Sequence, residues 1–156
     1  MMISTKGRYA LRFLIDIAEH QAQGYVPLRD AARRQDISEK YLEIIVKALV
    51  QGGLLAALRG KGGGYRLSRR PEEYTVREIL AVTDGPLAPV TCLEEGQTCA
   101  RTDRCPTRAL WQGLDQVISA YLDRYTLADL IDRDSSKSSH FAAPERTIPL
   151  DAEEKL

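Results

Sequence analysis

The sequence lacks any apolar run of roughly eighteen residues, the shortest stretch that is read as a bilayer-crossing helix. Its first residues, Met1 to Gly7, also lack the charged-then-apolar order of a secretory signal peptide. We therefore expect a cytoplasmic protein without a membrane partner. Its 156 residues allow one domain, or a small domain with an appendage.

Motifs of the common nucleotide-dependent enzymes are also missing. The run from Gly60 to Gly64 contains a Gly-Lys pair, but a P-loop needs another glycine five residues earlier and Ser or Thr after the lysine. Leu55 and Gly62 occupy those two places. We find no pairing of a nucleophile with a base either, so we do not expect an enzyme. A redox enzyme or a cluster carrier is the weakest alternative.

Cysteine and histidine are scarce. Three cysteines, Cys92, Cys99 and Cys105, lie in one short segment, and the histidines are His20 and His140. An odd number of cysteines without a secretory signal fits metal or redox chemistry better than a disulfide framework. The spacing, C-x6-C-x5-C, lacks the C-x2-C pair of a structural zinc site. Soft thiolates suit an iron–sulfur cluster, while a thiol switch, a zinc site or inert cysteines remain open.

Charge is unevenly distributed along a chain whose net charge is zero. Residues 1–70 contain 13 Lys and Arg against 6 Asp and Glu, whereas residues 71–156 contain 9 against 16. A basic half is the electrostatic signature of a polyanion-binding surface. The acidic half argues against non-specific coating of nucleic acid.

The first half has the pattern of a helix-turn-helix. Helices are expected at about 5–21, 28–35 and 38–51, and Ser38 suits the N-cap of the third. Gly52 and Gly53 should end that helix. Its buried face is marked by an apolar stripe at helical spacing, formed by Leu42, Ile45, Val46 and Leu49. The short turn between the second and third helices makes them one helix-turn-helix unit.

Two short runs, 54–59 and 65–68, predict a hairpin around glycines that permit positive φ angles. A hairpin directly after a helix-turn-helix is typical of the wing of a winged helix. Arg59, Lys61 and Arg66 place positive charge at its tip and base. The expected fold class is therefore mostly α with a small β wing.

The second half predicts an appendage to this domain. A helix at about 76–83 leads to the cysteine-bearing loop, and a long apolar helix at about 106–125 should pack on its twin in a homodimer, with Leu114 and Tyr121 facing the partner. A short helical turn at 126–131 precedes a polar segment that should be disordered. The expected divisions are a DNA-binding domain at 1–84, a sensor loop at 85–105, a dimerisation region at 106–132 and a tail at 133–156.

Four segments together resemble a known family: TKGRYAL at 5–11, ISEKYLE at 37–43, RGKGGGY at 59–65 and AVTDGP at 81–86. Over roughly residues 1–132 the chain resembles the bacterial winged-helix regulators typified by IscR, NsrR and RirA. The resemblance implies a homodimeric transcription regulator, such as a repressor, that binds a double-stranded DNA operator. It also implies an iron–sulfur cluster, [2Fe–2S] or [4Fe–4S], held by Cys92, Cys99 and Cys105. The alternative is a cluster-free winged-helix regulator that senses thiol oxidation or a small ligand.

Two departures from the family pattern leave the fourth cluster ligand unknown. Arg108 stands where IscR-like members carry a histidine ligand, and Arg8 stands where NsrR-like members carry an acidic ligand from the partner's first helix. The first gap between cysteines is also one residue longer than in the commonest pattern. Asp103, Glu94, Glu95 or a small molecule are the remaining candidates.

The resemblance also implies DNA-contacting residues. Glu43 and Arg59 are expected to contact bases or set selectivity, because a carboxylate accepts from the amino group of cytosine. Lys40 stands where IscR has a serine, so the operator is expected to differ. Phosphate contacts are expected from four basic residues: Arg8, Lys47, Lys61 and Arg66.

Overall fold

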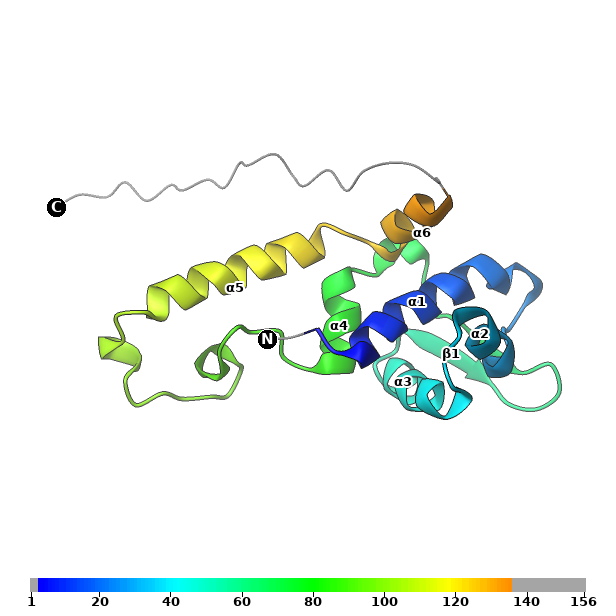
Figure 1. Ribbon diagram of the computed structural model, residues 1–156, viewed down its shortest axis with the longest axis horizontal. Helices are drawn as coiled ribbons and strands as arrows, with labels where there is room; N and C mark the ends of the chain where they lie inside the picture. Colours follow the sequence, from blue (N-terminus) through cyan, green and yellow to red (C-terminus); the bar gives the residue numbers. More distant parts are fainter. Residues whose placement is uncertain (1–2, 136–156) are drawn as a thin grey trace.

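The computed structural model describes residues 3–135, with side chains as far as residue 131. Over this part of the chain the order of elements is α1 (Thr5–His20), η1 (Gln21–Gln23), α2 (Leu28–Gln35), α3 (Glu39–Gln51), β1 (Leu55–Leu58), β2 (Gly64–Leu67), η2 (Pro71–Glu73), α4 (Val76–Asp84), η3 (Thr91–Leu93), η4 (Thr102–Arg104), α5 (Arg108–Asp123) and α6 (Leu127–Ser135). Figure 1 shows α1 to α4 and the hairpin gathered in one body, with α5 and the preceding loop extending away from it. The expected fold class is confirmed.

The core of this body is built from the apolar faces of helices that pack around α1. Helix α1 begins at a cap, because the Ser4 hydroxyl accepts from the Gly7 N–H. Phe13, Leu14 and Ile17 on α1 are completely buried. The predicted inner stripe of α3 is buried too, which confirms the helical spacing read from the sequence.

A buried ion pair fixes α2 against α1. The Arg34 guanidinium donates to both carboxylate oxygens of Asp16, at 2.9 and 2.7 Å. Asp16 is 1% exposed, and Gln35 adds a third hydrogen bond to its carboxylate at 3.2 Å. Because a buried carboxylate needs such partners, this network sets where the first helix of the helix-turn-helix lies.

The hairpin pairs β1 with β2 in antiparallel register from Leu55 opposite Leu67 to Leu58 opposite Gly64. Val26, just before α2, also pairs with Tyr65 through two backbone hydrogen bonds of 2.8 and 2.9 Å. Gly64 is needed at this crossing, because a Cβ there would lie 2.3 Å from the Val26 carbonyl oxygen. The wing is therefore attached to the helix-turn-helix at its base.

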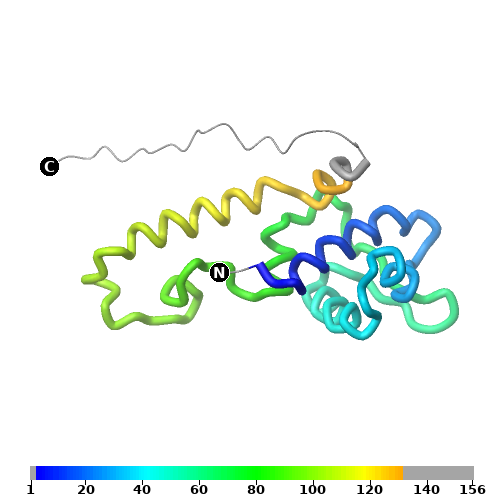
Figure 2. Tube along the Cα trace, in the orientation of Figure 1, coloured from blue at the N-terminus to red at the C-terminus, as the bar shows by residue number. Residues whose placement is uncertain are grey.

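Helix α5 differs from its prediction in length and in surroundings. It starts at Arg108 rather than near 106 and ends at Asp123 rather than near 125, and the Thr107 side chain that precedes it gives no cap. It has 16 residues, as many as α1. None of its residues is buried in the single chain. The tube in Figure 2 shows it running beside the loop rather than over the body.

The chain returns to the body after α5. Leu127 at the start of α6 is 0% exposed and joins the main core, and its N–H donates to the Tyr74 carbonyl at 3.0 Å. Helix α6 continues to Ser135, so the helical turn predicted at 126–131 was too short and the first three residues of the predicted tail are helical. The rest of that predicted tail, residues 136–156, lies outside the described residues. In the part of the chain described, no helix is both long and apolar enough to cross a membrane.

Candidate nucleic-acid interface and sensor loop

The turn between α2 and α3 is closed by short-range backbone geometry. Asp36 ends α2 in the left-handed conformation, with φ 53°, and the Ile37 N–H donates to the Ala32 carbonyl at 3.0 Å. Ser38 then caps α3, because its hydroxyl accepts from the Tyr41 N–H at 3.3 Å. The predicted cap is confirmed, and the turn fixes the direction in which α3 leaves α2.

The outer face of α3 carries a stripe of residues whose neighbours along the axis are about one helical turn apart: Lys40, Glu43, Ile44 and Lys47. All four are exposed, while the opposite face is buried in the core. The three that the sequence singled out as DNA contacts, Lys40, Glu43 and Lys47, therefore share one solvent-facing surface. A helix presented in this way has the shape that the major groove admits.

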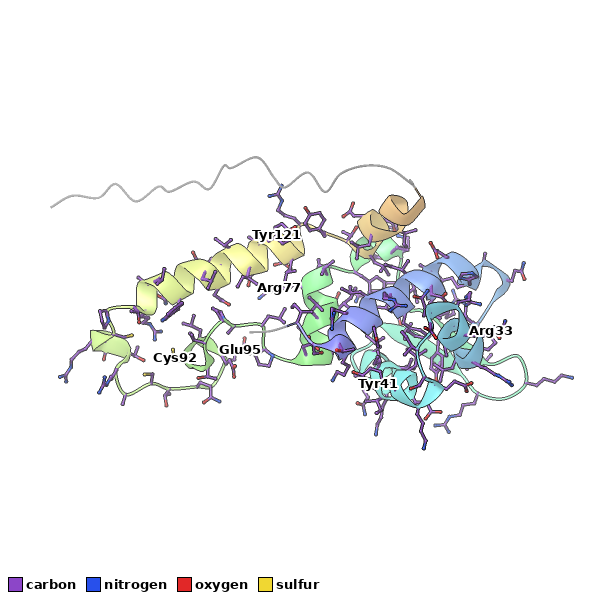
Figure 3. The ribbon with its side chains drawn as sticks, in the orientation of Figure 1. Arg33, Tyr41, Arg77, Cys92, Glu95 and Tyr121 are labelled. Atoms are coloured by element: carbon purple, nitrogen blue, oxygen red, sulfur yellow. The ribbon has the colours of Figure 1, made fainter. Side chains whose placement is uncertain are left out.

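Helix α2 adds two basic residues that sequence reasoning missed. Arg29 and Arg33 are 85% and 81% exposed and line a cleft that also includes Ser38 and Glu39 at the start of α3. Each has a carboxylate at 3.9 Å, Glu39 and Asp30 respectively, so each is only loosely paired. Figure 3 shows Arg33 on the outside of the body. The one-turn spacing of two arginines on this short helix was the available signal.

The wing presents charge at its tip. Arg59 and Lys61 are exposed in the turn between β1 and β2, where Gly60 and Gly62 take positive φ angles. Arg66 lies at the base, with its guanidinium carbon 5.7 Å from the centroid of the Tyr25 ring. Arg8 is exposed in the first turn of α1 and donates to the Thr5 hydroxyl at 3.1 Å. These positions leave all four residues accessible to a polyanion.

The entry to the cysteine loop is tied to α1. The Asp84 carboxylate at the end of α4 accepts from the Ser4 N–H at 3.0 Å and from the Ser4 hydroxyl. Gly7 makes this approach possible, since a Cβ there would lie 2.6 Å from an Asp84 carboxylate oxygen. Gly85 follows with φ 80° and turns the chain away from the body. The same serine hydroxyl thus caps α1 and anchors the loop.

The three cysteines occupy different parts of the loop. Cys92 lies in η3, Cys99 precedes η4, and Cys105 follows it; each is half-buried and none is in a disulfide. The Thr102 hydroxyl donates to the Cys99 carbonyl at 2.8 Å and accepts from Arg108 at 3.3 Å. Figure 3 shows Cys92 on the loop facing α5.

Thr107 connects Cys105 to α5. The Trp111 indole N–H donates to the Thr107 hydroxyl at 3.2 Å, which leaves that hydroxyl free to donate to the Cys105 sulfur at 3.5 Å. Hydrogen bonding from Thr107 lowers the pKa of the Cys105 thiol, and Arg108 adds a smaller effect in the same direction. Thr107 is therefore the larger cause of the lowered pKa of Cys105.

The donor set fits an iron–sulfur cluster in kind, because it offers three free thiols on one loop. Within the described residues, however, no three metal-ligating side chains stand close enough together to hold an ion. Glu94 and Glu95 instead line a groove between α4 and α5, and Asp103 is exposed in η4. The loop conformation described here thus favours none of the candidate fourth ligands.

Helix α5 presents an uncovered apolar face. Leu110, Leu114 and Val117 are 63%, 41% and 53% exposed and recur at steps of four and three residues. Tyr121 continues this face and meets Tyr125 edge to face, with ring centroids 5.1 Å apart. An ion pair between Arg77 and Asp123, 3.3 Å, holds the end of α5 to α4.

A helix-turn-helix with an exposed outer stripe, followed by a basic two-stranded wing, defines a winged-helix DNA-binding protein. The chain belongs to the Rrf2 family of iron-dependent transcriptional regulators, whose family model matches residues 3–133. It is therefore a DNA-binding transcription regulator, in agreement with the resemblance read from the sequence. Membership in a family of regulators also agrees with the expectation that it is not an enzyme.

Individual relatives support this assignment. The chain is 39% identical over 132 residues to the transcriptional regulator IscR of Serratia proteamaculans, a match that covers 85% of this chain and 80% of the relative. Its fold matches CymR, described as the global cysteine regulator of B. subtilis, with a TM-score of 0.69, 35% identity and coverage of 85% and 98%. It also matches IscR of T. potens with a TM-score of 0.68, 31% identity and coverage of 90% and 95%.

Proposed function

We propose that this protein is a homodimeric, cytoplasmic regulator whose affinity for a double-stranded operator depends on an iron–sulfur cluster held by Cys92, Cys99 and Cys105. The observation that carries the proposal is the placement of three free cysteines between a DNA-binding body and an uncovered apolar helix. The similarity to two IscR proteins supports the cluster. The cluster would supply a group whose charge and integrity respond to iron, oxygen or nitric oxide.

The DNA contacts proposed for this chain follow the exposed surfaces. Glu43 on α3 and Arg59 at the wing tip would read bases, while Lys40, Lys47, Lys61, Arg8 and Arg66 would contact the backbone or adjacent groups. Glu43→Ala should relax discrimination among operator variants more than it weakens binding to random DNA. Equal losses on every sequence would remove Glu43 from the recognition role. Titrations of operator and scrambled duplexes at one salt concentration separate the two results.

The dimer is proposed to form through the apolar face of α5. Leu114→Glu would place an unpaired charge on each side of that interface, which costs several kcal/mol per buried ion and should weaken the dimer by at least roughly 10³-fold. Gln116→Glu is the matched control, because Gln116 is exposed and about 200° around the helix from Leu114. Sedimentation velocity should show monomers only for Leu114→Glu. If Leu114→Glu remains dimeric, the apolar face of α5 is excluded as the interface.

The cluster is tested by anaerobic reconstitution of the full-length chain. Wild type should take up iron and sulfide and gain visible absorption, and each of Cys92→Ala, Cys99→Ala and Cys105→Ala should fail to hold the cluster stably. Operator titrations of loaded and apo protein should then differ. Because Arg108 replaces a histidine ligand, chelators should remove iron more readily than from a cluster with four strong protein ligands.

A cluster-free thiol sensor is the second candidate. It is favoured by the lowered pKa of Cys105 and by the similarity to a regulator described as controlling cysteine. Under this alternative, wild type takes up no iron, yet oxidation of the thiols changes operator affinity. A response to oxidant in wild type and its loss in the triple cysteine variant, both without iron, would establish the thiol sensor in place of the cluster.

A further inference from the structure

Among the described residues, large hydrophobic side chains are exposed at five positions: Leu110, Leu114 and Val117 on α5, Leu58 on β1 and Ile44 on α3. The first three form the face proposed for dimerisation. The other two lie on the elements proposed to contact DNA, and Ile44 is 59% exposed. The helix that presents its outer face to solvent therefore carries one large apolar group on an otherwise polar stripe.

Ile44 is surrounded by the proposed DNA contacts. It follows Glu43 directly and lies one helical turn from both Lys40 and Lys47, all of them exposed. The core cannot explain it, because the buried positions of α3 are Leu42, Ile45, Val46 and Leu49. A β-branched side chain gains nothing on a solvated helix surface, either in helix propensity or in hydration.

The major groove offers one apolar group at base edges, the C5-methyl of thymine. We propose that Ile44 contacts this methyl group and selects thymine at one position in each operator half-site. The inference rests on the proposed DNA-binding role of α3. Adjacent helix residues are separated by about 1.5 Å along the axis, whereas base pairs are separated by about 3.4 Å. Ile44 therefore reads the base pair that Glu43 reads or the neighbouring one.

The charges around Ile44 support a nucleic-acid occupant over a protein one. Lys40 and Lys47 flank it on α3, and Arg29 and Arg33 are exposed on the adjoining α2. A groove walled by phosphates matches this basic frame around a small apolar centre. The wing tip adds Arg59 and Lys61, which are also exposed.

The experiment begins with selection of bound duplexes from a random pool by the full-length protein, in both loaded and apo forms. Each thymine of the selected operator is then replaced in turn by deoxyuridine, which removes only the C5-methyl group. Wild type and Ile44→Ala are titrated against every duplex at one salt concentration. Thermal unfolding of each variant shows that the fold is retained, and Ile44→Val provides a milder second variant.

One thymine per half-site should be sensitive to the replacement. Replacing this thymine by deoxyuridine should weaken wild-type binding by about 4-fold in one half-site, or by about 15-fold in both half-sites. This is the factor expected for one buried methyl group at each site. Ile44→Ala should bind the thymine operator with a similar loss and show no further loss on the uracil operator. Gln116→Ala is the control, because Gln116 is exposed on α5 away from its apolar face; its thymine-to-uracil ratio should equal that of wild type.

The outcomes separate this inference from the proposed function. Selection of a defined operator with no thymine sensitivity, or with the same sensitivity in Ile44→Ala, overturns the methyl contact and leaves the regulator intact. Normal operator binding by Ile44→Ala would also overturn the assignment. Failure of the pool to yield any preferred sequence overturns both proposals.

Discussion

The dependence of operator affinity on salt tests the charge that the structure places on α3 and the wing. The four residues expected to contact phosphates are exposed, and none makes an ion pair within the residues described: Arg8 on α1, Lys47 on α3, Lys61 at the wing tip and Arg66 at its base. Two protomers would therefore bring about eight such cations to the duplex. Eight phosphate contacts correspond to a slope of about −7 in a plot of log affinity against log salt, or a loss of about 10⁴-fold between 50 and 200 mM.

Lys61→Ala removes two of these contacts from the dimer. The slope should become about −5, and the loss over the same range should shrink to about 10³-fold. The change should be equal for operator and scrambled duplexes, because a phosphate contact carries no sequence information. Fluorescence anisotropy titrations at four salt concentrations measure both slopes.

Arg124→Ala is the matched control for this prediction. Arg124 is exposed and its loss removes the same charge, but it follows α5 rather than lying on the DNA-facing elements. Its slope should equal that of wild type. A Lys61→Ala slope that also equals wild type would show that the wing tip does not touch phosphates, and the assignment of the wing would be refuted.

Two further predictions concern the sensor loop and the fold. In apo protein that retains only Cys105, Thr107→Val should shift the pH dependence of Cys105 alkylation to higher pH, because the hydroxyl that stabilises the thiolate is lost. Thr107→Ser should restore the wild-type pH dependence. A pH dependence that Thr107→Val leaves unchanged would exclude the hydrogen bond. Asp16→Ala should lower the free energy of unfolding by about 3 kcal/mol, the lower end of the range for breaking a buried pair, since Arg34 keeps some solvent contact. Arg33→Ala, which breaks an exposed pair, should cost under about 1 kcal/mol in the same urea titration.

The parts of the fold that the sequence predicted are those governed by local rules. The cap at Ser38, the inner stripe of α3 and the hairpin depend on residues close in the chain, so spacing alone was informative. The ends of α5 were less predictable, because Thr107 uses its hydroxyl on Cys105 and Trp111 rather than as a cap. The polar composition after residue 132 likewise hid the last turn of α6.

The parts that the sequence did not predict depend on contacts between distant residues. Ser4 and Asp84 are 80 residues apart, and nothing in either local pattern indicates that they meet. Leu127 was assigned to the dimerisation region, yet it is completely buried in the core of the DNA-binding body. The candidate cluster site was predicted only as a set of cysteines, because loop conformation and the fourth ligand are not encoded in spacing.

The segment from residue 85 to residue 124, called the arm, carries the cysteine loop and α5 and is attached to the body at both ends. These two attachments give a route by which the proposed signal would reach the DNA-binding surface. At the entry, Asp84 is bonded to Ser4 at the start of α1; at the exit, the Val76 N–H donates to the Tyr125 carbonyl at 2.9 Å and α6 packs against α1. Because both ends of the arm are held, we expect a change in the loop to alter how α5 lies against the body. In a dimer joined through α5, that angle sets the separation of the two α3 helices, which must match half-sites about 34 Å apart. A bound group then regulates affinity to the extent that it favours one arm angle over another.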